Sequence, residues 1–339
     1  MSRRSAVAIA ALAVLVLAAA VVAVGVGPVP VSPGRVLEVL TGSDGGDGGP
    51  QPADARIIRR VRLPRVLLAM VVGVALAVCG VAFQGLLRNP LADPFILGTS
   101  SGAALAATIF IATGLAHRLG GPLLLPAASF VGSLIALTAV YLLARTGGHV
   151  PVEVLLLAGV IVNAFLFALV LLVLALAELE AIEILLWLMG SLALGAQPGL
   201  LTVVAVLVLV GSAAVWAMAR DLDAMSLGEE QAGLLGVATE NLKRRLFVVV
   251  SVVVGAAVSV SGIIGFVGLI VPHIARLLVG AAHRILVPTA ALLGALFLVV
   301  ADTVARTALS PDEMPVGVVT ALAGAPFFLA LLRKRKRAF

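Results

Sequence analysis

Charged residues are scarce in this sequence, because Asp, Glu, Lys and Arg make up only 12% of its 339 residues. Soluble globular domains carry about 25% of these residues. Apolar residues reach 62% here, and the mean hydropathy is +1.20. The composition excludes a soluble globular domain and predicts a protein that lies mostly within a lipid bilayer.

Residue types that support catalysis or metal binding are also few. Cys79 is the single cysteine, which excludes an intrachain disulfide. The four histidines show no metal-ligand spacing and no serine has a nearby base, so the sequence supports neither a metal site nor a membrane enzyme. No G-x-x-x-x-G-K-[ST] phosphate loop is present, so the chain cannot bind and hydrolyse ATP alone. We expect no cofactor in this chain, and nothing in it points to nucleic acid.

Long apolar runs, in contrast, are abundant. About 20 apolar residues cross a membrane as a helix, and the alternation of a β-barrel is absent. The first run follows Arg3 and Arg4, exceeds a signal-peptide core in length and lacks a clear cleavage site, so we interpret it as an uncleaved span. Ten spans are predicted, at residues 6–27, 64–86, 95–114, 122–144, 152–176, 199–219, 245–264, 267–280, 287–306 and 316–332. The prediction is one all-α membrane domain over residues 1–339, with 182–193 too short to span and expected as a half-inserted or interfacial helix.

Ten spans place both termini on one side of the membrane, and positive charge selects the cytoplasmic side. With the termini inside, fifteen Lys and Arg residues lie inside and eight outside. Five of the eight cluster just before the second span, and two explanations stay open: an acidic partner outside, or lipid headgroups. The cluster consists of Arg56, Arg59, Arg60, Arg62 and Arg65. The glycine-rich segment 42–49 on the same side is expected to be a flexible loop.

The polar interval 220–245 separates two spans on the inner side. Its alternating charged and apolar residues predict short amphipathic helices, broken at Gly228, Gly233 and Gly236. Such helices suit docking to a soluble partner, and a solvated loop is the alternative.

Two further patterns concern transport. Glycine, alanine, valine and proline positions recur at an offset of 182 in two spans that start from opposite sides, which suggests an inverted repeat typical of transporters. Asp302 is the clearest acid deep in a span, and Arg306 follows one turn later, where it can neutralise that acid. The pattern therefore argues against an ion-coupled secondary transporter and for energy supplied by a partner.

Several motifs together resemble one family, the FecCD permeases, which are membrane subunits of type II ABC importers for iron-siderophore complexes, haem and vitamin B12. The motifs begin at residue 62 and cover most of the chain. They are Arg62-Leu63-Pro64-Arg65; Gln84-Gly85 with Arg88-Asn89-Pro90-Leu91-Ala92-Asp93-Pro94 and Leu97-Gly98; Leu227-Gly228 with Leu235-Gly236; Gly265-Phe266-Val267-Gly268 through Pro272-His273; and Ala301-Asp302 with Arg306, Pro315 and Gly317.

The resemblance implies a bacterial inner-membrane permease with ten helices per subunit and both termini in the cytoplasm. Its partners would be a second permease copy, two cytoplasmic ABC ATPases that hold ATP and Mg²⁺, and a periplasmic or lipid-anchored substrate-binding protein. A ferric siderophore is the expected substrate, with haem and cobalamin as alternatives. The segment 182–193 matches a short outer helix lining the path.

The resemblance also assigns roles to residues. Arg62, Arg65 and Arg306 match arginines that dock the binding protein, and Asn89 and Leu91 match an inner gate. Segment 226–237 matches the helices that couple to the ATPase. Its assigned residues are Ser226, Leu227, Gly228, Glu229, Ala232, Leu235 and Gly236. The acidic 42–49 insertion and Glu153 near the gate depart from the family pattern.

Overall fold

The computed structural model describes residues 3–27, 30–42, 52–115, 121, 123–147, 149–193 and 195–336. Within these ranges the regular structure is helical, apart from an isolated bridge between Thr146 and His149. Residues 43–49 of the glycine-rich loop lie outside the described residues.

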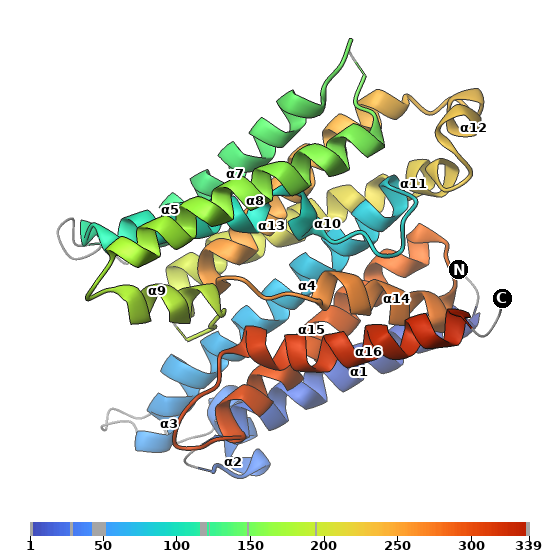
Figure 1. The fold of residues 1–339 in the computed structure, drawn as a ribbon. Coiled ribbons are helices and arrows are strands. Elements are labelled where there is room, and N and C mark those ends of the chain that lie inside the picture. The colour runs from blue at the N-terminus through green and yellow to red at the C-terminus, as the bar shows by residue number, and fades with distance from the viewer. Residues whose placement is uncertain are drawn as a thin grey trace.

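Ten apolar helices build the molecule (Figure 1). They are α1 (Arg3–Gly25), α4 (Leu63–Leu86), α5 (Thr99–Ala112), α7 (Leu124–Ala144), α8 (Val152–Leu176), α10 (Pro198–Ala217), α13 (Thr239–Ser261), α14 (Val267–Val279), α15 (His283–Thr307) and α16 (Val316–Lys336). Seven are long and apolar enough to cross a membrane, and α5, α14 and α16 contribute shorter apolar stretches. Each overlaps one predicted span, and the prediction of an all-α membrane fold is confirmed.

Several helix boundaries differ from the sequence prediction by a few residues, and two of them have a clear local cause. The span expected at 95–114 starts with a 3-10 turn, η2 (Pro94–Leu97), and Gly98, at φ 87°, turns the chain into α5. The span expected at 245–264 begins six residues earlier, at Thr239, because its first turns are polar and an apolar window misses them.

Besides η2, six shorter helices lie between the spans in the described part of the chain. They are α2 (Pro33–Thr41), α3 (Ala53–Ile57), the π-helix η1 (Ile58–Arg62), α9 (Ala181–Leu188), α11 (Ala219–Met225) and α12 (Glu229–Leu234). Helix α9 confirms the short helix expected within 182–193. Helices α11 and α12 confirm that the polar interval 220–245 folds into short helices.

Glycines allow the central helix α4 to approach its neighbours closely. A Cβ on Gly73 would collide with the carbonyl oxygen of Gly294 in α15, and one on Gly80 with that of Gly268 in α14. Gly102 of α5 faces Gly132 of α7 in the same way. Small residues at such crossings let membrane helices pack backbone to backbone. Helix α4 is consequently buried along most of its length.

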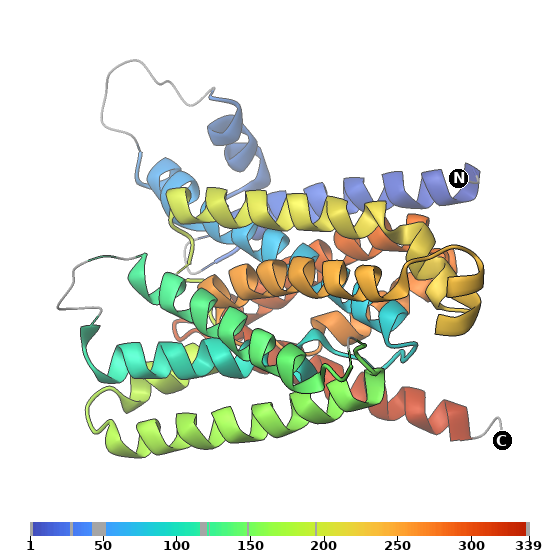
Figure 2. The same ribbon diagram turned by 90° about the horizontal axis from the view of Figure 1, so that it is seen from above.

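The two ends of the bundle differ in what they carry (Figures 1 and 2). Helix α1 begins and α16 ends at the end where α11 and α12 project, as an even number of spans requires. We call this the α12 end and the opposite one the α9 end. Helices α4 and α13, which carry the two copies of the sequence repeat, run in opposite directions.

Candidate functional site

Segment 226–237 forms an exposed surface at the α12 end, which we call the coupling surface. Leu227, Leu234 and Leu235 are 64%, 86% and 65% exposed. Ala232, in contrast, is fully buried and anchors α12 against the bundle. Three exposed leucines within nine residues are unusual on a surface that meets water, and such exposure marks protein contacts.

Two glycines shape this surface. Gly228 joins α11 to α12 at φ 129°, a conformation that residues with a Cβ rarely adopt. Gly236 follows α12 at φ 87°, and its N–H donates to the carbonyl of Gly233 at 2.9 Å. Left-handed glycines of this kind end helices sharply. The predicted breaks at both positions are therefore real turns, whereas Gly233 lies inside α12.

Lys243 fastens the coupling surface to the bundle. The residue is 3% exposed, and its ammonium group lies 2.5 Å from Glu229 Oε1 and 2.8 Å from Glu240 Oε1. It also donates to the carbonyl of Val150 at 3.2 Å, and the N–H of Val150 donates to Glu240 at 3.3 Å. Val150 stands two residues before α8. One buried cation thus joins α12, α13 and the entry to α8.

Helix α11 has its own attachment. Asp223 Oδ1 accepts from the backbone N–H of His283 at 2.9 Å and lies 2.7 Å from its Nδ1. The opposite edge of the imidazole, at Nε2, packs against Gly85 near the end of α4, where a Cβ would collide with it. Asp223 therefore couples α11 to the beginning of α15 and to the end of α4.

The residues matched to an inner gate lie in the loop after α4. Asn89 Oδ1 accepts from the N–H of Leu91 at 2.9 Å, and Leu91 is 43% exposed. A Cβ on Gly228 would lie 3.7 Å from NH1 of Arg88, so this loop borders the coupling surface. Asp93 closes the loop by accepting from the N–H of Phe95 at 2.8 Å, and burial raises the pKa of its carboxyl to about 6. The gating role itself stays a prediction.

The arginines matched to docking are buried at the α9 end. Arg62 is 5% exposed and Arg306 4%. Arg62 NH1 donates to the carbonyl oxygens of Val24 and Gly25 at 3.1 and 3.0 Å, and Arg306 donates to two further carbonyls of the same stretch at 3.2 Å each. Cations at the last carbonyls of a helix are stabilising. The two arginines thus cap the end of α1.

Asp302 joins these arginines into one network. It is 1% exposed, and its two oxygens each accept at 3.0 Å, one from Arg65 and one from Arg306. Arg65 also contacts Glu313 at 2.8 Å. The predicted pairing of Asp302 with Arg306 is confirmed. The docking role of the arginines stays a prediction, and their geometry shows a structural role that the sequence did not reveal.

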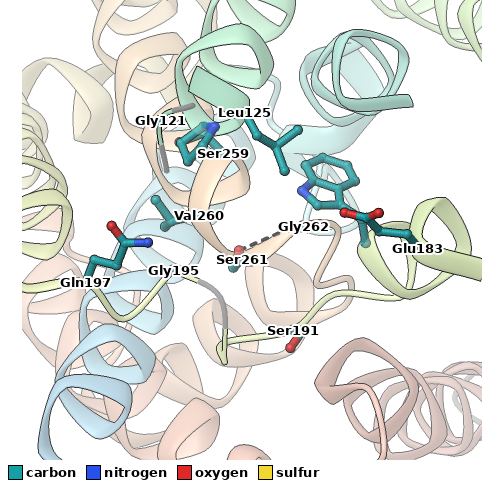
Figure 3. Close-up of a pocket in the computed structure, with 12 residues that line it drawn as sticks. Gly121, Leu125, Glu183, Ser191, Gly195, Gln197, Ser259, Val260, Ser261 and Gly262 are labelled. Carbon is teal, nitrogen blue, oxygen red and sulfur yellow. Dashed lines mark hydrogen bonds between the residues drawn. The ribbon is translucent and has the colours of Figure 1, made fainter. Parts of the chain in front are cut away.

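A pocket of about 300 Å³ opens at the α9 end (Figure 3). Its walls come from α7, α9, α13 and the connection between α9 and α10. Glu183 of α9 lies on one side of the pocket and Gln197 on the other, with Ser261 between them, and Trp187 of α9 also lines it. The N–H of Ser191 donates to the carbonyl of Ser261 at 2.8 Å, which holds the end of α9 against the end of α13. Helix α9 thus forms a wall of this pocket.

Sequence reasoning missed Lys243, Asp223 and His283. The Glu240–Lys243 spacing of three residues was a visible helical ion-pair signal. The contact between Lys243 and Val150 has no sequence signature. The same holds for the contact between Asp223 and His283, which lie 60 residues apart in the chain. In the part of the chain that the structure describes, no group of three His, Cys, Asp or Glu side chains could hold a metal ion.

Comparison with known proteins agrees with this architecture. The profile of the FecCD transport family matches residues 13–334. The cobalamin import system permease protein BtuC of Halobacterium salinarum is 46% identical over 289 residues, which cover 85% of this chain and 76% of that protein. The hemin transport system permease protein HmuU of Yersinia pestis is 45% identical over 286 residues, covering 81% and 83%.

A solved structure shows the same fold. It is a metal-chelate type ABC transporter in an inward-facing conformation, which is 32% identical, has a TM-score of 0.83, and matches 97% of this chain and 99% of its own. Ten apolar helices, a family match over nearly the whole chain and a shared fold point to one conclusion. The chain belongs to the FecCD transport family and is a multi-pass membrane permease of the metal-chelate, haem and vitamin B12 class of type II ABC importers.

Proposed function

We propose that this permease moves an iron-siderophore-type chelate into the cell, with haem or cobalamin as the alternative cargo. The observation that carries the ATP-driven part of the proposal is the coupling surface with its three exposed leucines, and the choice of cargo rests on the similarity to a metal-chelate type ABC transporter. A chain without a phosphate loop needs a separate ATPase to use ATP. The exposed leucines of the coupling surface suit contact with such a partner.

The proposed assembly contains two copies of this chain, two ABC ATPases and a substrate-binding protein. The α12 end and both termini face the cytoplasm of a bacterial inner membrane, and ATP and Mg²⁺ bind to the ATPases. The binding protein approaches the α9 end. There Arg62, Arg65 and Arg306 shape the docking surface through the end of α1, and exposed Arg56 and Arg60 offer charges to acidic lobes.

The attachments of the coupling surface suggest how ATP acts on the pathway. Movement of α12 reaches α8 through Lys243 and Val150, and movement of α11 reaches α15 and α4 through Asp223 and His283. For transport, ATP must favour one packing of the dimer and the loaded binding protein another. The pocket at α9 serves as the outer vestibule, and the loop with Asn89 and Leu91 as the inner gate.

Ion coupling is the competing mechanism, and the geometry disfavours it. A coupling acid must be free to capture a proton or Na⁺ near the midplane. Asp302 instead has each carboxylate oxygen committed to an arginine. Energy from a partner ATPase fits this arrangement better.

The test is uptake by proteoliposomes that contain the permease with its ATPase and binding protein. We expect uptake of a ferric siderophore to require ATP inside the vesicles and to persist when ionophores collapse ion gradients. Parallel assays with haem and cobalamin identify the cargo. Uptake that follows an ion gradient without the ATPase would contradict the proposal.

Replacing Lys243 by methionine is expected to lower the amount of substrate moved per ATP hydrolysed by about fivefold, the lower range of a typical coupling energy. The methionine fills the buried space but removes the link between α12 and Val150. Arg244→Met is the matched control, because Arg244 is an exposed neighbour in the same helix. Equal transport per ATP in both variants would remove Lys243 from the coupling route.

A further inference from the structure

A second pocket, at the α12 end, takes no part in the coupling surface. It has a volume of about 230 Å³ and is lined by Trp216, Ala217, Ala219, Arg220 and Arg284. These residues come from the end of α10, the first turn of α11 and the beginning of α15. We call it the Trp216 pocket.

The pocket presents positive charge from two arginines, Arg220 and Arg284. The indole N–H of Trp216 donates to the carbonyl of Arg284 at 2.9 Å, and the Arg284 guanidinium lies 6.0 Å from the centre of the indole ring. Both arginines are exposed, and neither has an acidic partner among the described residues. Of the two acids in α11, Asp223 is turned to His283, and Asp221, which follows Arg220 in the chain, forms no ion pair with either arginine among the described residues. The pocket therefore suits an anion.

The position of the pocket identifies the kind of anion. An exposed apolar strip on α10 leads to it, formed by Val203, Val206, Leu209 and Val210. Helix α10 is one of the candidate spans, so an exposed apolar strip on it suits contact with lipid chains. Trp216, 46% exposed, stands where the strip ends, at the depth where tryptophans mark the membrane interface. An occupant can thus lay acyl chains on the strip and its headgroup on the arginines.

We propose that the Trp216 pocket binds the phosphodiester headgroup of an anionic phospholipid in the leaflet at the α12 end. Basic pockets between membrane helices on the cytoplasmic side attract such headgroups. The lipid would brace α10, α11 and α15 where Asp223 attaches α11 to His283. A water-soluble anion would use the two arginines but gain nothing from the apolar strip.

Trp216 supplies its own reporter, because the chain contains only two tryptophans. In a Trp187→Phe background, quenching of Trp216 by brominated phosphatidylglycerol and brominated phosphatidylcholine measures the relative affinity of the full chain for each lipid. We expect phosphatidylglycerol to bind about tenfold more tightly, and Arg220→Gln with Arg284→Gln to abolish that preference. Arg56→Gln with Arg60→Gln, exposed at the other end, is the matched control and should keep it.

Two other outcomes decide the matter. Glycerol phosphate serves as a soluble competitor of brominated phosphatidylglycerol. If it relieves the quenching as effectively as unbrominated phosphatidylglycerol does, the site takes a soluble anion and the proposal is wrong. Equal quenching by both lipids in the protein with both arginines also overturns it. Should the double variant fail to fold, Arg284→Lys, which keeps the charge, is expected to retain part of the preference, and Arg220→Gln alone to lose part of it.

Discussion

Asp302→Ala is expected to destabilise the folded chain by about 3–5 kcal/mol, the cost typical of breaking a buried ion pair. The change would leave Arg65 and Arg306 with buried positive charges and no carboxylate between them. Because Arg306 also caps α1, the loss should loosen the whole α9 end. The effect is measured by thermal unfolding in detergent, monitored through the loss of the monodisperse peak.

The control for this prediction is Asp312→Ala, because Asp312 is exposed on the same end and should tolerate the change. Asp302→Asn keeps the shape and an acceptor oxygen, and is expected to be intermediate in stability. If Asp302→Asn instead folds and binds its partners normally but stops uptake, Asp302 acts directly in transport. The structural assignment would then be wrong.

The membrane helices were well predicted from the sequence because the hydropathy of a segment directly indicates whether it lies in lipid or in water. The errors fell where other forces set the boundary. Helix α13 begins at Thr239 because Glu240 pairs with the buried Lys243 in the polar turns that precede the apolar run. Helix α5 begins at Thr99 because Asp93 and Gly98 impose a 3-10 turn first.

Functional residues were harder to interpret than spans. The turns at Gly228 and Gly236 were predictable because glycines act locally, whereas the coupling role of this segment stays a prediction. The burial of Arg62, Arg65 and Arg306 was not predictable, since their partners are backbone carbonyls of α1 and acids that lie more than 230 residues away from Arg65. The arginine cluster before the second span was interpreted as a docking surface. The structure shows in addition that Arg62 of this cluster caps the end of α1.

Gly228→Val is expected to abolish ATP-driven uptake while the protein still inserts into the membrane. At φ 129° a β-branched side chain is strongly disfavoured, and the backbone must leave this conformation. The Gln231 side chain that a Cβ would strike can move aside, but the strained backbone cannot be relieved without turning α12. That turn would displace Leu227, Leu234 and Leu235 together.

Gly233→Ala is the matched control for this change, because nothing lies within 4 Å of a Cβ there and the residue is inside α12. Alanine favours a helix over glycine by about 1 kcal/mol, so this variant should keep or slightly raise stability and transport. Co-purification with the ATPase separates lost docking from lost movement. Normal uptake by Gly228→Val would contradict the coupling assignment, because that assignment requires the leucines to be held by the turn at Gly228.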